Sequence, residues 1–341
     1  MNGFRIGIVG CGGIANRHIA GYRSVAGDLG EVVAGCDPNE EILQGYCDKY
    51  AIPHRFTRAE DMIASGQVDV ISLLTPPAVR HEVIFPAIEQ GIHLLVEKPF
   101  GETLADAVSF VEAAEKAGVV LAVNHQMDFT RDMEAIRQAI ASGRIGQVRH
   151  IAHDHLQNRT RVQGWRSREQ RLEISIFSIH LIDRIRILAG SPPTSVAAVM
   201  RSWNPDVEGE TYTSLNVQFE NGTVGTMVSN WHSPTLPECR LRIDGTQGSL
   251  LSAKEGFLAD KATLRIQPAD GALEELDCSQ QDTFPTAMGQ SMRHLLEAAR
   301  QGIEPLHSGR GNLQTMQIVD AAYLSAQRGG ALVEVGKISS S

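Results

Sequence analysis

Over the first 125 residues, short apolar runs alternate with longer stretches in which apolar positions recur every three or four residues. The short runs predict buried strands and the longer stretches predict helices, because these are the side-chain periods of the two structures. The expected strands are 4–9, 32–36, 68–74, 93–96 and 119–123, and the expected helices are 14–25, 40–50, 78–90 and 103–117. Strands and helices in this alternation predict a parallel, doubly wound sheet with helices on both faces.

After about residue 147 the pattern changes to a one-for-one alternation of apolar and polar residues, which is typical of strands with one buried face. The expected strands are 148–156, 196–203, 211–219, 223–231 and 239–243, with Asn221-Gly222 as a hairpin turn, and helices are expected at 173–188, 288–299 and 313–326. We therefore predict an α/β domain over 1–125 and an α+β domain with an open, mostly antiparallel sheet over 126–341. The C-terminal helix is a candidate to pack back on the first domain, and residues 339–341 are expected to fray.

The length and charge of the chain narrow the class of partner. At 341 residues it exceeds the usual size of one domain, which agrees with two domains sharing a cleft. Its 31 basic and 40 acidic residues give a formal charge of −9, and the basic residues are scattered, which disfavours a nucleic-acid partner. A small neutral or polar ligand fits better. Because an open antiparallel sheet must cover its free face, we expect a homodimer or a homotetramer.

Cysteine usage and hydropathy indicate the compartment. The five cysteines are Cys11, Cys36, Cys47, Cys239 and Cys278, and none forms a Cys-x-x-Cys pair. Neither a disulfide framework nor a zinc site is expected from this pattern. There is no charged leader and no run of about 20 apolar residues, so we expect no membrane association and a cytoplasmic location.

A glycine-rich turn follows the first predicted strand. Gly10 permits a tight turn, Gly12 lets the backbone approach a phosphate, and Ala15 is a small residue where a helix packs on the strand. A dinucleotide pyrophosphate would lie at the positive end of that helix. The run by itself is also compatible with a plain tight connection, but the strand before it and the amphipathic stretch after it favour the cofactor interpretation.

Asp37 ends the second predicted strand, roughly 20 residues after the glycines, as the dinucleotide fingerprint expects. Its carboxylate would accept hydrogen bonds from the adenosine ribose and repel a 2′-phosphate, which favours NAD over NADP. Asp37-Pro38-Asn39 also fits a turn and a helix N-cap before Glu40, and both interpretations can hold together.

Lys98 follows an apolar strand, at the sheet edge where ligands of doubly wound sheets bind; Thr75-Pro76 also falls at that edge. A lysine there can bind a substrate hydroxyl and stabilise the oxygen as hydride leaves its carbon. The alternatives are an ion pair between Glu97 and Lys98, or a solvated lysine.

His180 and Asp183 share one face of an apolar helix because they are three residues apart. A histidine can take a proton near neutral pH, and a carboxylate one turn away can orient its ring or hold a hydroxyl. A satisfied buried polar contact is the alternative. Glu173, two turns earlier, is either a second acid of the site or the partner of Arg166, Arg168 or Arg171 in a surface ion pair.

His150, His153 and His155 suggest a metal cluster, yet only the last two share a strand face and a third ligand is missing, so no metal is expected. Asp154 should point to the opposite face. Trp165-Arg166 either brings a guanidinium near the cofactor or substrate, or contains a structural tryptophan.

With these residues identified, the chain resembles the Gfo/Idh/MocA family of glucose-fructose oxidoreductase and inositol 2-dehydrogenase relatives. The resemblance rests on the glycine turn of residues 6–15, Thr75-Pro76-Pro77 with His81, residues 91–99 ending in Glu97-Lys98-Pro99, His180-Leu181-Ile182-Asp183 before Leu188-Ala189-Gly190, and residues 318–326. It implies an N-terminal Rossmann domain and NAD(P)-dependent oxidation of a sugar or polyol hydroxyl. It further implies that Lys98 orients substrate and that His180 is the acid/base.

The chain departs from the family pattern around the histidine. Ile176 stands where the family commonly has an aspartate, Ser178 replaces a common glycine, and Gln126-Met127-Asp128-Phe129 replaces a frequent Arg-Phe. Either Glu173 or Asp183 must then supply any carboxylate assistance to His180.

We predict an NAD-dependent dehydrogenase that oxidises a secondary or anomeric hydroxyl of a sugar, polyol or sugar acid. The alternatives are an oxidoreductase that recycles tightly bound NAD, and a non-catalytic dinucleotide- or sugar-binding regulator. The predicted catalytic residues are Lys98, His180 and Asp183. The predicted cofactor-binding residues are Gly10, Gly12, Gly13, Ile14, Ala15, Asp37, Thr75, Pro76, His81, Glu97, Lys98, Gln126, Trp165 and Arg166, and the predicted substrate residues are Lys98, His155, Asn158, Glu173, His180 and Asp183.

Overall fold

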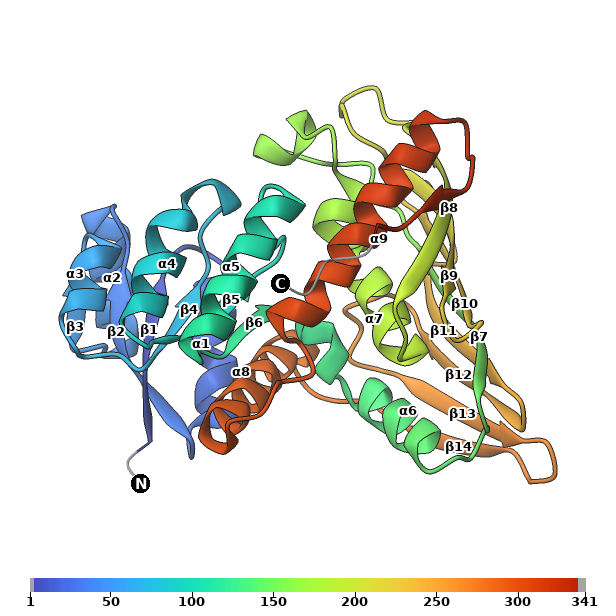
Figure 1. Cartoon of the computed structure of the whole chain (residues 1–341), viewed down its shortest axis with the longest axis horizontal. Helices are drawn as coiled ribbons and strands as arrows, with labels where there is room; N and C mark the ends of the chain where they lie inside the picture. The colour runs from blue at the N-terminus through green and yellow to red at the C-terminus, as the bar shows by residue number, and fades with distance from the viewer. Residues whose placement is uncertain (1–2, 337–341) are drawn as a thin grey trace. The chain divides into compact units, whose positions relative to one another are not determined.

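The computed structural model describes residues 3–336, apart from the side chain of Trp165 (Figure 1). The expected frayed end at 339–341 lies outside the described residues. The chain forms two compact units, the first made of residues 1–129 and 284–313 and the second of residues 130–283 and 314–341. Each unit therefore contains two separate segments of the chain, and the two-segment first unit differs from the continuous domain 1–125 expected from the pattern.

The first unit contains a six-stranded sheet in which every neighbouring pair is parallel. Its strands are β1 (Phe4–Val9), β2 (Gly30–Cys36), β3 (His54–Phe56), β4 (Val70–Leu73), β5 (His93–Glu97) and β6 (Leu121–Asn124), in the order β3-β2-β1-β4-β5-β6. This is the predicted doubly wound sheet, and its strand order reverses between β1 and β4, where such sheets bind ligands. The three-residue β3 is too short to produce a periodic signal, and the sequence pattern missed it.

Helices connect these strands. They are α1 (Ala15–Gly21), continued by the π-helical turn η1 (Tyr22–Ala26), then α2 (Glu40–Tyr50), α3 (Ala59–Ala64), α4 (His81–Glu89) and α5 (Leu104–Ala117), with 3-10 turns η2 (Pro77–Val79) and η3 (Gln126–Phe129). Local capping explains two of the helix starts. Asn39 accepts a hydrogen bond from the Ile42 N–H at 3.1 Å, and Thr103 forms a capping box with Asp106.

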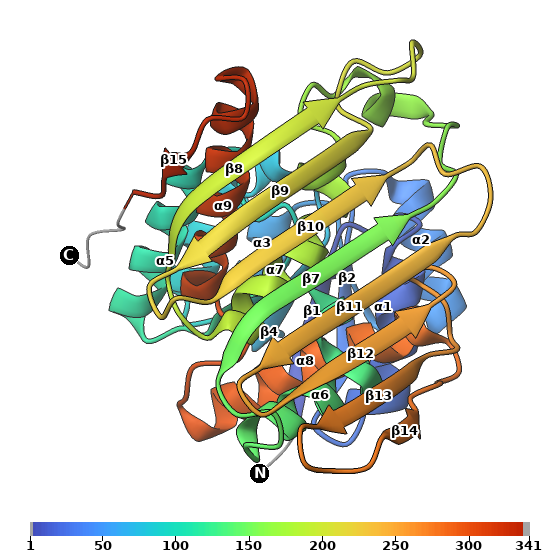
Figure 2. The same cartoon turned by 90° about the vertical axis from the view of Figure 1, so that its right-hand side faces the viewer.

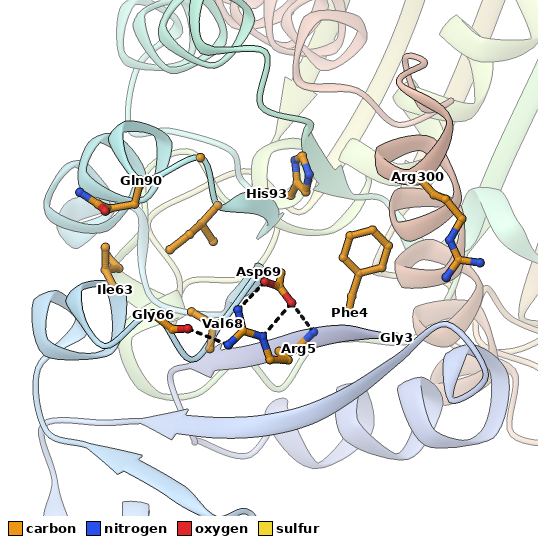
Figure 3. A pocket seen from close by; sticks show the side chains of 12 residues that line it. Gly3, Phe4, Arg5, Ile63, Gly66, Val68, Asp69, Gln90, His93 and Arg300 are labelled. Carbon is orange, nitrogen blue, oxygen red and sulfur yellow. Dashed lines mark hydrogen bonds and ion pairs between the residues drawn. The ribbon is translucent and has the colours of Figure 1, made fainter. Parts of the chain in front are cut away.

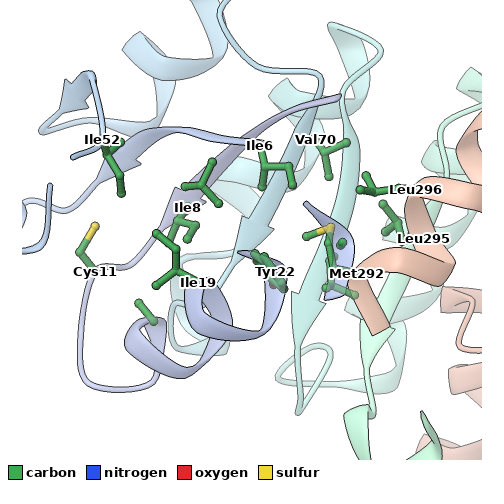
Figure 4. Close-up of a cluster of buried hydrophobic side chains, with 14 of the residues drawn as sticks. Ile6, Ile8, Cys11, Ile19, Tyr22, Ile52, Val70, Met292, Leu295 and Leu296 are labelled. Carbon is green, nitrogen blue, oxygen red and sulfur yellow. The ribbon is translucent and has the colours of Figure 1, made fainter. Parts of the chain in front are cut away.

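The core of the first unit includes a helix that comes from far along the chain. Helix α8 (Thr283–Gln301) packs Met292, Leu295 and Leu296 against apolar side chains of the parallel sheet and of α1 (Figure 4). Helices α1 and α8 approach each other until their backbones are in contact. A Cβ added to Gly21 would lie 2.0 Å from the Pro285 carbonyl oxygen, and a Cβ added to Gly289 would lie 2.2 Å from the Gly21 oxygen. Only glycine fits at this crossing.

The second unit contains a nine-stranded sheet (Figure 2). Its strands are β7 (Val148–Leu156), β8 (Pro193–Arg201), β9 (Tyr212–Phe219), β10 (Val224–Asn230), β11 (Glu238–Gly245), β12 (Gly248–Lys254), β13 (Thr263–Pro268), β14 (Glu274–Asp277) and β15 (Val333–Glu334), in the order β14-β13-β12-β11-β7-β10-β9-β8-β15. Only the β7–β10 pair is parallel, so the sheet is mostly antiparallel, as predicted. The hairpin turn at Asn221-Gly222 is confirmed, with Gly222 at φ +83°.

Helices cover one face of this sheet. The helical segments are α6 (Arg131–Ala141), η4 (Gly164–Arg168), η5 (Glu173–Phe177), α7 (Ile179–Ala189) and α9 (Gly309–Gln327), whose first residues belong to the other unit. Positions along β7 and β10 alternate between buried and half-exposed, and α7 packs against both strands. Thr226 and Val228 are among the half-exposed positions of β10. Figure 2 shows the face of the sheet on which none of the described helices lies in front of the strands. Within residues 3–336, no helix is long and apolar enough to cross a membrane.

Candidate functional site

The glycine-rich turn has the geometry that a dinucleotide requires. Gly10 adopts φ +97°, a conformation that favours glycine, and its N–H donates to the Cys36 carbonyl at 2.8 Å. Gly12 and Gly13 have no heavy atom within 4 Å of an added Cβ, so the turn faces open space. Ala15, with no exposed surface, begins α1 directly after Ile14. The turn thus presents bare backbone and a helix N-terminus to a ligand.

Asp37 lies beside this turn. Its Oδ2 accepts a hydrogen bond from the Cys11 N–H at 2.9 Å, and its Oδ1 accepts one from the Asn39 N–H at 3.0 Å. The turn and N-cap interpretation is correct for Asn39, which caps α2. Of the two backbone donors that hold the Asp37 carboxylate, the Cys11 N–H belongs to the glycine turn. A surface hollow of about 490 Å³, lined by Cys11, Asn16 and one side of α2, opens next to it.

A buried arginine, which the sequence analysis missed, ties together the loops after β4 and β5. Arg80 is 1% exposed and donates to the Thr75 carbonyl at 2.8 Å, to the Phe100 carbonyl at 3.1 Å and to the Pro99 carbonyl. Burial lowers the pKa of its guanidinium to about 10, so it is still charged at neutral pH. Arg80 therefore fixes the backbone directly after Lys98 and next to Pro76.

Glu97 is part of a buried hydrogen-bonded chain rather than a simple pair with Lys98. Its Oε1 accepts from His18 Nε2 at 2.9 Å and from Asn124 Nδ2 at 2.5 Å, and His18 Nδ1 lies 2.7 Å from the Tyr22 hydroxyl. Burial alone would raise the pKa of Glu97, but His18, Lys98 and Asn124 stabilise the anion and lower the pKa to about 2. A carboxylate thus stays ionised at the end of β5, immediately before Lys98.

Several buried polar atoms at the carboxyl ends of the parallel strands lack a partner among residues 3–336. They are Thr75 Oγ1 after β4, Asn124 Oδ1 at the end of β6, and Gln126 Oε1 in η3. Buried polar groups are rarely left without hydrogen bonds, so these atoms indicate where a ligand supplies them. Together with the open space at Gly12 and Gly13, they fit a bound dinucleotide.

His81 has a different setting from the other predicted cofactor residues. It is the first residue of α4, and its Nε2 lies 3.2 Å from Asp106 Oδ1 at the start of α5. Its ring also contacts Phe110 with centroids 4.7 Å apart. In this unit His81 connects two helices.

Another hollow of the first unit, of about 720 Å³, lies at the opposite edge of the parallel sheet (Figure 3). Arg5 at the start of β1 and His93 at the start of β5 line it, and the Arg5 guanidinium pairs with Asp69 at 2.6 Å. Because cofactors of doubly wound sheets bind at the carboxyl ends of the strands, this hollow is separate from the dinucleotide edge.

In the second unit, Phe257 brings predicted site histidines together. His180 is the second residue of α7, and its ring centroid lies 5.9 Å from that of Phe257, while the His155 centroid lies 5.7 Å from the same ring. Burial and the nearby charge of Arg159 lower the pKa of His155 to about 4, so its imidazole is neutral at pH 7. Phe257 lies in the loop between β12 and β13, which contains no residue predicted to belong to the site.

The carboxylates predicted to assist His180 are both buried. Asp183 accepts from Arg186 Nε at 2.9 Å and from the Thr315 hydroxyl. Glu173 has no exposed surface and accepts from the Ser178 hydroxyl, and burial raises its pKa to about 7. Glu173 is therefore not in a surface ion pair; Arg171 pairs with Asp320 instead.

The remaining predicted residues belong to the connection between β7 and η5. Asn158 forms an isolated β-bridge with His232, and Arg166 is exposed in η4. The side chain of Trp165 lies outside the described part of the chain. On β7, His153 and His155 are buried on one face, and Asp154 pairs with Arg240 on the other, as the strand period predicts.

A parallel sheet of this strand order, with a glycine turn and an acidic residue after β2, defines a dinucleotide-binding α/β protein. Residues 4–125 match the family described as oxidoreductase family, NAD-binding Rossmann fold, and residues 133–251 match the GFO/IDH/MocA C-terminal domain. The chain belongs to the Gfo/Idh/MocA family of oxidoreductases, and its cofactor domain is an NAD-binding Rossmann domain.

Similar proteins include several sugar-converting enzymes. The chain is 27% identical to a D-apiose dehydrogenase of Paraburkholderia graminis over 96% of this chain and 88% of that protein. It is 28% identical to a 1,5-anhydro-D-fructose reductase of Ensifer adhaerens over 83% of this chain and 86% of that protein. Its fold matches an oxidoreductase from Agrobacterium radiobacter, solved with NAD+, L-tartaric acid and magnesium, with a TM-score of 0.89 at 23% identity over 98% of this chain and 99% of that one.

Proposed function

We propose that this protein is an NAD-dependent dehydrogenase that oxidises a secondary or anomeric hydroxyl of a sugar, polyol or sugar acid. The observation that carries the proposal is the set of features at the carboxyl ends of the parallel strands, which we call the dinucleotide edge. This edge contains the open glycine turn, Asp37, Lys98 and the buried oxygens that have no partner among the described residues. Membership of an oxidoreductase family with sugar dehydrogenases among its relatives supports the substrate class.

In this proposal the cofactor is held by the turn from Gly10 to Ala15 and by Asp37, with Thr75, Pro76 and Gln126 along the edge. His81, Glu97, Trp165 and Arg166 stay predictions for the same role. An Asp37 carboxylate fixed beside the turn favours two ribose hydroxyls and disfavours a 2′-phosphate, which supports NAD over NADP.

The chemistry assigned to the chain is proton transfer and charge stabilisation. His180 accepts the proton of the substrate hydroxyl, and the Lys98 ammonium stabilises the oxygen as its negative charge develops. When bound, the nicotinamide accepts at C4 the hydride that leaves the same carbon. Asp183, anchored by Arg186 and Thr315, fixes the part of α7 that carries His180. His155 and Asn158 are proposed to contact substrate, and reduction uses the same residues in reverse.

We also propose that the open face of the nine-stranded sheet binds a second copy of the chain in a cytoplasmic homodimer or homotetramer. Half-exposed Val224, Thr226 and Val228 lie side by side on this face in β10, and their burial would stabilise association. Light scattering of the purified protein tests this, because association gives a multiple of the chain mass.

The proposed activity is tested by NADH formation at 340 nm with NAD or NADP and a panel of polyols, aldoses and sugar acids. We expect turnover with NAD and a loss of about 10²- to 10⁴-fold in kcat/KM for His180→Ala, with a comparable loss for Lys98→Ala. Arg58→Ala is the control, because the Arg58 side chain is 67% exposed and has no role in the proposed site.

Binding of NAD by calorimetry without turnover of any compound would contradict the dehydrogenase. Reduction of bound NAD by one compound, followed by slow release of NADH, would favour the enzyme that recycles tightly bound NAD. Binding of NAD that no compound reduces would favour the non-catalytic regulator.

A further inference from the structure

The connection between β7 and η5 is unusually rich in arginine. Residues 157–172 contain five arginines and one acid, Glu169. Arg171 is accounted for by its ion pair with Asp320 and by the Tyr323 ring, 4.3 Å from its guanidinium carbon. The segment therefore carries a net positive charge, because it contains several arginines and one acidic residue.

Arg159 is the arginine of this segment that is most firmly built into the fold. Its backbone N–H donates to the Trp231 carbonyl at 2.9 Å, and its guanidinium carbon lies 3.7 Å from the centre of the Phe177 ring and 5.3 Å from that of Trp231. The side chain is half-buried, and it has no ion pair or side-chain hydrogen bond among residues 3–336. Stacking uses the flat face of a guanidinium and leaves its N–H edge for a ligand.

Other donors near Arg159 also lack acceptors. The Trp231 indole is completely buried, and its Nε1–H has no partner among the described residues. The buried Gln157 Nε2, two residues before Arg159, has none either. A group of donors without acceptors fits a ligand that brings acceptor oxygens.

The electrostatics agree with an anionic ligand. Burial and the charge of Arg166 lower the pKa of Arg159, which means that its positive charge is poorly compensated. Glu173 is the acid that acts on it, but burial raises the pKa of Glu173 to about 7, and its carboxyl accepts from Ser178. The charge of Arg159 also lowers the pKa of His155, which connects this group to the site residues.

Arg159 is connected, within the second unit, to the segment that precedes the proposed catalytic histidine. Phe177, on which it stacks, precedes His180 by three residues, and Ser178 between them begins α7. On the other side, His155 and His180 share the Phe257 ring. The Arg159 guanidinium is therefore stacked on the segment that leads directly into the helix carrying His180.

We propose that Arg159 binds an anionic group of the substrate, so that the preferred substrates are sugars carrying a carboxylate or a phosphate rather than neutral sugars. This inference rests on the proposed dehydrogenase function and narrows its substrate class. Arg159 is a specificity-determining residue in this proposal, while His180 and Lys98 act on the hydroxyl.

The test compares matched substrates that differ at one carbon: D-galactose, D-galacturonate and D-galactose 6-phosphate, and the corresponding glucose series. We expect the wild type to oxidise an acidic member with kcat/KM at least tenfold above its neutral partner. Arg159→Met, which keeps the apolar stem, should raise KM for the acidic substrate about 10- to 100-fold and change the neutral one little. Arg159→Lys should restore part of the preference, and the uronate and phosphate arms distinguish the two anions.

Arg161→Met is the matched control, because Arg161 is exposed and has no ion pair or ring contact among the described residues. Melting temperatures confirm that each variant is folded. A neutral sugar preferred by the wild type and unaffected by Arg159→Met would overturn the inference and leave the dehydrogenase intact. A rise in KM for NAD instead of the sugar acid would also overturn it, because Arg159 would then hold the cofactor.

If no substrate is turned over, the anion site is tested by binding instead of activity. Calorimetry then measures the binding of D-galacturonate, D-glucuronate and the two 6-phosphates to the NADH-bound protein. Binding of one of these anions that is weakened by Arg159→Met but not by Arg161→Met supports the anion site even though the dehydrogenase proposal fails. Absence of such binding overturns the anion site.

Discussion

Single buried side chains position the dinucleotide edge of the first unit. Arg80 bridges carbonyl groups from two loops, and Glu97 collects donors from α1 and β6. Neither side chain needs to touch the cofactor for this role. Arg80 fixes the backbone at Thr75 and after Lys98, and Glu97 fixes the end of β5 directly before Lys98. Buried charges that satisfy several partners at once are costly to remove, since the partners are left without hydrogen bonds.

Replacing Arg80 with methionine should therefore destabilise the first unit and damage the site. The Thr75, Pro99 and Phe100 carbonyls would lose their donor, at a cost of about 2–4 kcal/mol in the free energy of unfolding. Because the Lys98 loop would loosen, we expect kcat/KM to fall roughly 10- to 100-fold. Urea unfolding and steady-state kinetics measure both effects.

Arg58→Met is the control for this prediction. Arg58 is 67% exposed, and among the described residues its ion pair is with Glu60, so its loss should change neither stability nor kinetics noticeably. Equal effects of the two substitutions would contradict the positioning role of Arg80.

At the scale of elements, the first unit depends on the crossing of α1 and α8. The two helices approach until backbone meets backbone at Gly21 and Gly289, and this approach lets Met292 and Leu296 reach the core of the parallel sheet. The same helix α1 carries His18 and starts at the glycine turn, so the packing of α8 supports the cofactor edge indirectly.

Gly289→Ala should consequently destabilise the protein, because the new methyl group would lie 2.2 Å from the Gly21 oxygen and 2.7 Å from its carbon. Overpacking against backbone costs about 1–3 kcal/mol, which thermal unfolding would detect as a lower melting temperature. Gly45→Ala in α2 is the opposite case, since no atom lies within 4 Å of its added Cβ. It should stabilise the protein by about 0.5–1 kcal/mol. A Gly289→Ala variant as stable as the wild type would show that the crossing is looser than described.

At the scale of the whole molecule, buried carboxyl groups in the two units make stability depend on pH in opposite directions. Glu97 has its pKa lowered from 4.5 to about 2, so it contributes stability above pH 4.5 that is lost as the pH falls toward 2. Glu173 has its pKa raised from 4.5 to about 7, so the folded state keeps a proton that the unfolded chain loses. Its contribution is present below pH 4.5 and is lost as the pH rises through 7.

Glu173→Gln should remove this second dependence, because the amide keeps the acceptor for Ser178 but carries no charge at any pH. Relative to wild type, the variant should gain on the order of 2–3 kcal/mol at pH 8 and little at pH 5. Urea unfolding at the two pH values measures the difference, with Glu134→Gln on the exposed side of α6 as control. A gain that is the same at both pH values would mean that Glu173 is ionised throughout.

The sequence by itself determined much of the architecture and of the cofactor edge. The short apolar runs predicted five of the six parallel strands, and the glycine turn, Asp37 and Lys98 could be located because each follows directly on a strand. In a parallel sheet the carboxyl ends of the strands form one edge, so local position along the chain already implies proximity there. Short or exposed strands such as β3 and β14 were not predicted, because they bury too few side chains to produce a periodic pattern of apolar residues.

Only the tertiary structure decided which distant segments serve these local features. It placed α8 in the first unit, connected Arg80 to the Lys98 loop, brought Phe257 against two histidines, and stacked Arg159 on Phe177. These partners lie far apart in the chain or on separate elements, and no periodicity relates them. Periodicity reports which face of an element is buried, but the partner that covers it is chosen by packing and by the need to satisfy buried charges.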